Sequence, residues 1–157
     1  MLRTMKDKSN IVVLGIGNPL RRDDGLGIRI IGEMRKDDRY AGIEIIDGGT
    51  SPDLLSLLDE NVGKLVIVDA LRSGSKPGTI YRLEINESNI ADDGPASVHG
   101  LGVLDSLKMM RKLGIRAPAV VIIGVEPADT SHGLHLSPEI EALLPQVLAK
   151  ISEEIKA

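Results

Sequence analysis

The stretch IVVLGIGNPLRRDDGLG, residues 11–27, decides the class of fold. It begins with the apolar run IVVLG at 11–15, which is typical of a buried strand. A glycine-rich loop follows, and from Leu26 onward apolar residues recur at helical spacing. A buried strand, a tight loop and an amphipathic helix in this order predict an α/β protein.

The rest of the chain alternates apolar runs with amphipathic stretches. We expect further strands at residues 43–47, 64–70 and 119–125, and a half-exposed edge strand at 79–84. Further helices are predicted to start at Ser51-Pro52, to cover 98–113, and to start at Ser137-Pro138, the last with a break at Pro145. Continuous apolar strands separated by helices predict a mostly parallel sheet with helices on both faces.

Length and composition indicate one soluble domain. A chain of 157 residues is expected to form a single domain over residues 1–157, with 1–9 as a flexible N-terminal extension. The 19 basic and 23 acidic side chains give a net charge of −4, which argues against nucleic-acid binding through a basic surface. Because no apolar run is long enough to span a membrane, we expect a cytoplasmic protein without a membrane span.

The absence of cysteine narrows the chemistry. Disulfides, thiolate metal sites and cysteine nucleophiles are excluded. Phenylalanine and tryptophan are absent as well, so a stacking platform for bases or flat cofactors is not expected. Any metal site must therefore use His, Asp and Glu.

Glycines after a first strand are also typical of dinucleotide-binding proteins. That fingerprint needs a third glycine three residues after Gly17, but residue 20 is Leu. Asp23 and Asp24 fall where the helix N-terminus would receive a pyrophosphate, and their carboxylates would repel it. The lysine of a phosphate-binding loop is missing too. These features argue against a nucleotide site.

Three potential metal ligands are expected at one edge of the sheet. Asp24 follows the glycine-rich loop, Asp69 ends the strand at 64–70, and His99 lies near the start of the helix at 98–113. Ligand sites of such folds lie at the carboxyl ends of the strands, so these side chains could converge there. Two carboxylates and an imidazole, with positions left open, suit a catalytic divalent metal. Each also has a structural explanation, and Asp23 is expected to cap the following helix.

Two further features have a functional and a structural interpretation. His132 and His135, with Glu139, precede the last helix, but without an HExxH pattern a solvated loop is favoured over a metal site. Glu126 follows the strand at 119–125, where it could line a substrate groove or cap the turn. No G-x-S-x-G elbow supports a serine hydrolase of the common α/β type.

Six segments together resemble the maturation endopeptidases of nickel–iron hydrogenases. They are GIGNPLRRDDGLG at 15–27, DGGTSP at 47–52, VDA at 68–70, SVHGLGVLDSL at 97–107, GVEP at 124–127 and GLHLSPEI at 133–140. Their order and spacing cover nearly the whole chain. The DGGTSP form is most similar to the branch that includes the hydrogenase-3 type.

The resemblance implies a twisted five-stranded sheet, with one antiparallel strand, between helices. It also implies that Asp24, Asp69 and His99 are the metal ligands and the catalytic residues. The implied reaction removes a short C-terminal extension from a hydrogenase large-subunit precursor that is already loaded with nickel. Because the substrate carries the nickel, the resting protease need not hold a metal.

A substrate groove and a partner complete the expectations from the sequence. We predict that Gly48, Gly49 and Thr50 border the groove for the C-terminal tail, together with Glu126. The expected partner is the precursor, and a monomer is expected. A nickel-binding or precursor-binding maturation chaperone without hydrolytic activity would use the same ligands, whereas a broad zinc peptidase would hold stoichiometric zinc. The resemblance disfavours both alternatives.

Overall fold

The computed structural model describes residues 10–85 and 102–157, and the five strands found there form one sheet in the order β2-β1-β3-β5-β4. The parallel strands are β1 (Ile11–Gly15), β2 (Glu44–Asp47), β3 (Lys64–Ala70) and β5 (Ala119–Val125). Strand β4 (Ile80–Ile85) forms one edge and pairs antiparallel with β5. The predicted fold class is confirmed.

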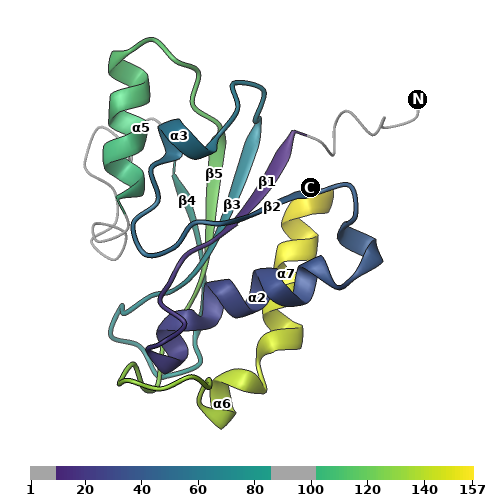
Figure 1. Cartoon of the computed structure of the whole chain (residues 1–157), viewed down its shortest axis with the longest axis vertical. Helices are drawn as coiled ribbons and strands as arrows, with labels where there is room; N and C mark the ends of the chain where they lie inside the picture. Colours follow the sequence, from purple (N-terminus) through teal and green to yellow (C-terminus); the bar gives the residue numbers. More distant parts are fainter. Residues whose placement is uncertain (1–9, 86–101) are drawn as a thin grey trace.

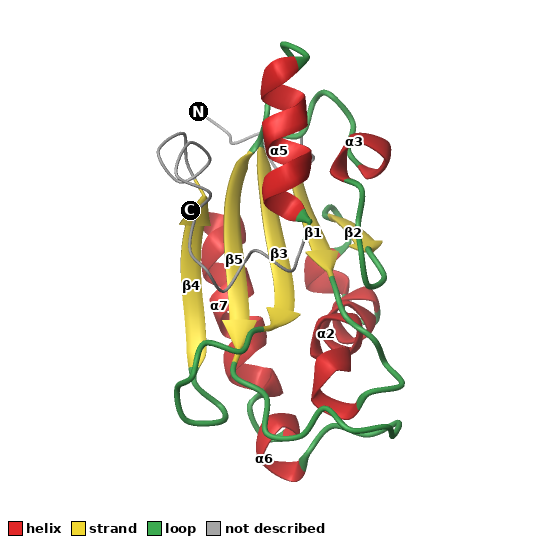
Figure 2. Cartoon of the chain, turned by 90° about the vertical axis from the view of Figure 1, so that its left-hand side faces the viewer, coloured by secondary structure: helices red, strands yellow, loops and turns green. Residues whose placement is uncertain are grey.

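Helices cover both faces of the sheet (Figure 1). Helices α2 (Leu26–Arg35) and α7 (Leu144–Lys156) lie on one face, and α3 (Leu54–Leu57) and α5 (Val103–Lys112) lie on the other (Figure 2). Three short helices lie in the connections: η1 (Arg22–Gly25), η2 (Asp38–Tyr40) and α6 (Pro138–Glu141). In the part of the chain that the structure describes, no helix has the length and apolar character to cross a membrane.

The two faces of the sheet form two separate apolar layers. Successive strand residues point to opposite faces, and both faces are buried in a parallel sheet covered by helices. Val12 and Leu14 of β1 accordingly pack in the layer with α3 and α5. Val13 packs in the layer with α2 and α7. The continuous apolar runs of the sequence therefore correspond to strands that are buried on both sides.

The structure refines the predicted bounds of three helices. Helix α3 is capped by Asp53 rather than by Ser51, because the Asp53 backbone is extended and its side chain accepts a hydrogen bond from the N–H of Leu55. The last helix is broken near Pro145, as predicted, into α6 and α7. Of the helix expected at 98–113, residues 98–101 lie outside the described residues, and α5 follows Gly102.

Glycines bring α2 into direct backbone contact with the sheet. A Cβ atom on Gly27 would lie 2.3 Å from the carbonyl oxygen of Val68 and 2.4 Å from that of Ile16. A Cβ atom on Gly15 would lie 2.5 Å from the carbonyl oxygen of Gly27. Because these obstacles are backbone atoms, no side chain fits at either position. The start of α2 is therefore held against the ends of β1 and β3.

We expect Gly27→Ala to destabilise the fold by about 3 kcal/mol or more, since the added methyl group can be accommodated only by moving backbone. Gly32→Ala in the same helix is the matched control, because a Cβ there meets nothing within 4 Å. That variant should gain up to about 1 kcal/mol from helix propensity. Urea unfolding of both variants measures the difference, and equal stabilities would contradict the close packing.

Candidate active site

A cavity of about 280 Å³ lies at the carboxyl ends of β1 and β3. This is the edge of the sheet at which the arrowhead of β3 ends in Figure 2. The chain continues from β1 to β2 on one side and reaches β3 on the other, so the cavity is at the switch in strand order. Its lining consists of Ile16, Gly17, Asp24, Thr50, Asp69, Ala70, Leu71, Arg72, Pro127 and Thr130.

Asp24 is placed at the cavity by the loop that follows β1. Gly17 has a φ of +145°, and a Cβ atom there would lie 1.9 Å from the carbonyl oxygen of Asp24. The loop then turns back so that the N–H of Asn18 donates to Oδ2 of Asp24 at 2.9 Å. Among the described residues the structure gives Oδ1 of Asp24 no partner. The carboxylate is thus held through one oxygen and can offer the other to a ligand.

Asp69 ends the apolar run of β3 and is only 5% exposed. Its Oδ1 accepts a hydrogen bond from the N–H of Ala70 at 2.7 Å. Burial, and then the charge of Asp24, raise the pKa of Asp69 to about 8, against the opposing effect of the Ala70 N–H group. Two carboxyl groups in one cavity repel each other when both are ionised, and this favours the binding of a cation between them.

The third predicted ligand, His99, lies outside the described residues. Within residues 10–85 and 102–157, no group of three His, Asp or Glu side chains could hold a metal ion. His132, His135 and Glu139 are all exposed. Their exposure agrees with the prediction of a solvated loop.

Asp23 is structural, as predicted, but it does not cap α2. Its side chain is 1% exposed, and it accepts hydrogen bonds from the N–H groups of Ala128, Asp129 and Ser137 and from the hydroxyl of Ser137. All of these donors lie between β5 and α6, more than 100 residues along the chain. Asp23 therefore fixes that connection, which includes the cavity residue Thr130, beside the loop that carries Asp24.

Of the four residues predicted to contact the substrate, Thr50 lines the cavity and the other three lie outside its lining. Gly48 and Gly49 continue the pairing beyond the strands: the Gly48 N–H donates to Gly15 and the carbonyl of Gly49 accepts from Gly17. Gly49 has a φ of +63°, a conformation that favours glycine.

Glu126 is 5% exposed, and its carboxylate holds the connection between β3 and β4. Its Oε1 accepts hydrogen bonds from the hydroxyl of Tyr81 at 2.6 Å and from the N–H groups of Ser73 and Ser75 at 2.8 and 3.2 Å. Burial opposes the ionisation of Glu126, but these hydrogen bonds outweigh it and hold its pKa below the ordinary range. The contacts agree with the turn-capping interpretation of this residue.

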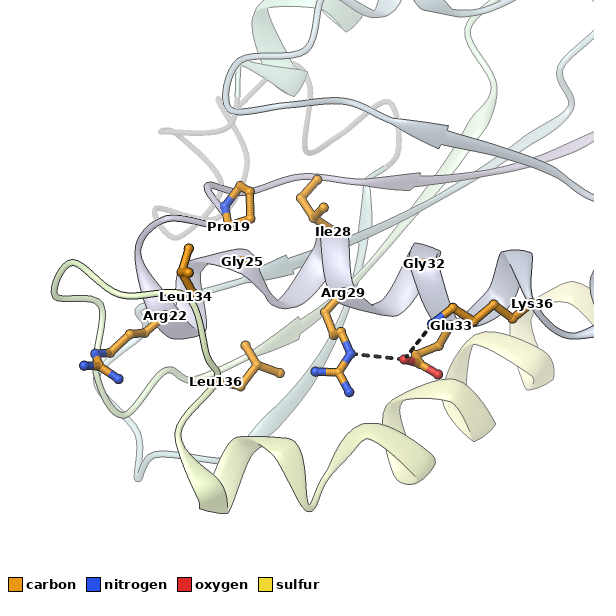
Figure 3. A pocket seen from close by; sticks show the side chains of 10 residues that line it. All are labelled: Pro19, Arg22, Gly25, Ile28, Arg29, Gly32, Glu33, Lys36, Leu134 and Leu136. Atoms are coloured by element: carbon orange, nitrogen blue, oxygen red, sulfur yellow. Dashed lines mark hydrogen bonds and ion pairs between the residues drawn. The ribbon is translucent and has the colours of Figure 1, made fainter.

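A second hollow, of about 300 Å³, lies along α2 and contains none of the predicted site residues (Figure 3). Pro19, Ile28, Leu134 and Leu136 supply its apolar lining. Its Arg29 is ion-paired with Glu33 and, across to α6, with Glu141. The acidic side chain of this hollow, Glu33, is thus engaged in an ion pair, whereas the two carboxyl groups of Asp24 and Asp69 line the first cavity.

The raised pKa of Asp69 predicts a dependence of stability on pH in the metal-free protein. Between about pH 4 and pH 8 the folded state keeps a proton that the unfolded state has lost, so this group lowers the free energy of unfolding as pH rises. Asp69→Asn cannot ionise and should be more stable than the parent at pH 8 by at least about 1 kcal/mol. Urea unfolding at pH 5, 6.5 and 8 measures this, and parallel pH profiles would contradict it.

Comparisons with known proteins agree with this fold and identify the family. Residues 28–154 match the family model described as hydrogenase maturation protease. The hydrogenase 2 maturation protease of Escherichia coli is 35% identical, with 91% of each chain covered, and a putative hydrogenase maturation protease of Methanocaldococcus jannaschii is 30% identical, with 91% of this chain and 89% of that protein covered. The structure of the E. coli endopeptidase HybD matches with a TM-score of 0.77 and 30% identity, covering 93% of this chain and 91% of that one. The chain belongs to the hydrogenase maturation protease family.

Proposed function

We propose that the protein is an endopeptidase that removes the C-terminal extension of a nickel-loaded nickel–iron hydrogenase large-subunit precursor. The family membership supports proteolysis during hydrogenase maturation. The observation that carries the proposal is the pair of carboxylates, Asp24 and Asp69, in one cavity at the switch in strand order. A pair of this kind can act in acid–base chemistry and can hold a cation.

The two carboxylates have different surroundings and take different roles. Asp69 is buried, and its raised pKa lets it hold a proton near neutral pH until a cation displaces that proton. Asp24 is fixed by the N–H of Asn18 through one oxygen, so the other can accept a hydrogen bond from a water molecule. A water activated in this way would attack the scissile carbonyl, and the proton would pass to a carboxylate and then to the leaving amine.

The donor set suits the nickel that the precursor brings. Asp24 and Asp69 each have one oxygen engaged by a backbone N–H group, which leaves one oxygen of each for the ion. Because a carboxylate oxygen has two lone pairs, the free oxygen of Asp24 could hold the ion and still accept a hydrogen bond from the attacking water. His99 is proposed as the third ligand on the basis of the family motif at 97–107. Nickel held there would polarise the scissile carbonyl as a Lewis acid. A cytoplasmic location, a monomeric state and a metal-free resting enzyme stay predictions.

We expect Asp24→Asn to reduce cleavage of the nickel-loaded precursor at least about 100-fold, because the amide cannot take a proton or bind a cation as the carboxylate does. The assay follows the intact mass of the precursor after incubation with purified protein. Asp47→Asn is the matched control: Asp47 ends the neighbouring strand β2, is exposed, and lies outside the cavity lining.

Two results would overturn the proposal. Normal cleavage by Asp24→Asn would remove the carboxylate pair from the mechanism. Binding of the precursor by the parent protein without any shortening would favour the chaperone alternative instead.

A further inference from the structure

Arg72 is the basic side chain in the cavity lining that the structure describes. It follows the end of β3, three residues after Asp69, and its side chain is exposed. Its Nη2 atom donates a hydrogen bond to the hydroxyl of Thr130 on the opposite connection. In the described part of the chain it forms no ion pair, although Asp24 and Asp69 line the same cavity. Most of the guanidinium donors are therefore available to a ligand.

The backbone on both sides of Arg72 is held in place. The N–H of Leu71 donates to the carbonyl of Val125 at 2.9 Å, and the N–H of Ser73 donates to the buried carboxylate of Glu126 at 2.8 Å. This anchoring reduces the conformational freedom that a ligand would have to remove on binding.

Thr130, which orients the guanidinium, is also held in place. Its carbonyl oxygen accepts a hydrogen bond from Nε of Arg21 at 3.1 Å. The N–H of its neighbour Asp129 donates to the buried carboxylate of Asp23 at 2.9 Å. Two buried carboxylates, Asp23 and Glu126, thus fix the two connections that meet at Arg72, and the guanidinium is presented to the cavity before any substrate arrives.

On the basis of the function proposed above, we propose that Arg72 is a specificity-determining residue that binds a carboxylate of the precursor close to the scissile bond. A planar guanidinium can donate two parallel hydrogen bonds to one carboxylate, which gives geometric selectivity as well as affinity. The carboxylate is close to the scissile bond because Arg72 shares a cavity of about 280 Å³ with Asp24 and Asp69. It belongs either to an acidic side chain or to the C-terminus of a short extension.

The test compares Arg72→Gln and Arg72→Lys with the parent on the nickel-loaded precursor, measuring kcat and KM for cleavage and Kd for binding. Arg72→Gln should raise KM and Kd about tenfold, with kcat changed less than about twofold, because a charge-assisted contact made on binding is lost. Arg72→Lys should lie between the two, since it keeps the charge but not the paired donors. Arg39→Gln, which removes an exposed arginine from a distant turn, is the control for net charge.

Variants of the precursor identify the carboxylate. If an acidic side chain is recognised, its replacement by the amide should make the parent and Arg72→Gln equal in KM. If the C-terminus is recognised, lengthening the extension by two residues should do the same. An effect of Arg72→Gln that stays undiminished on every precursor variant, or values equal to those of Arg39→Gln, would overturn the proposal.

Failure of the proposed function gives a different result. If the parent binds the precursor but does not shorten it, the endopeptidase function is wrong, and the Kd values still decide whether Arg72 recognises a carboxylate. Thermal unfolding midpoints within about 2 °C of the parent confirm that the variants are folded.

Discussion

The direct contact between the start of α2 and the ends of β1 and β3 is the constraint on which the rest of the structure depends. Gly15 and Gly27 permit it, because a Cβ atom on either would overlap backbone carbonyl atoms. Because the end of β1 and the start of α2 lie against each other, the connection between them turns back on itself, and it carries Asp23 and Asp24. The carboxylate of Asp23 is thereby directed to the later connection between β5 and α6, and the carboxylate of Asp24 to the cavity.

The cavity keeps its two acidic groups at a cost to stability. A buried carboxyl group beside a second carboxylate ionises with difficulty, and Asp69 shows this in its raised pKa. A cation relieves the conflict by neutralising both groups. The same arrangement that destabilises the free protein at higher pH therefore suits the proposed substrate, which would deliver its own metal ion. Functional sites commonly carry unfavourable electrostatics of this kind.

The sheet and the placement of Asp24 and Asp69 could be predicted from the sequence because both depend on local patterns. Apolar runs located the strands to within one residue, and the rule for strand ends brought Asp24 and Asp69 to one edge. The partners of Asp23 and Glu126 could not be predicted in the same way. Their hydrogen bonds join segments more than 40 residues apart, and most of the donors are backbone N–H groups that leave no trace in the residue types. Arg72 was missed for a related reason, since only the folded connections bring it to the cavity.

The most direct test is the intact mass of the hydrogenase large subunit from cells that lack this protein, beside that from the parent cells. A C-terminal extension kept only in the mutant would agree with an endopeptidase, and the mass difference would locate the cleavage site. Restoring the gene should remove the extension, whereas a copy with Asp24→Asn should not. Normal maturation of every hydrogenase large subunit in the mutant would contradict the proposed function.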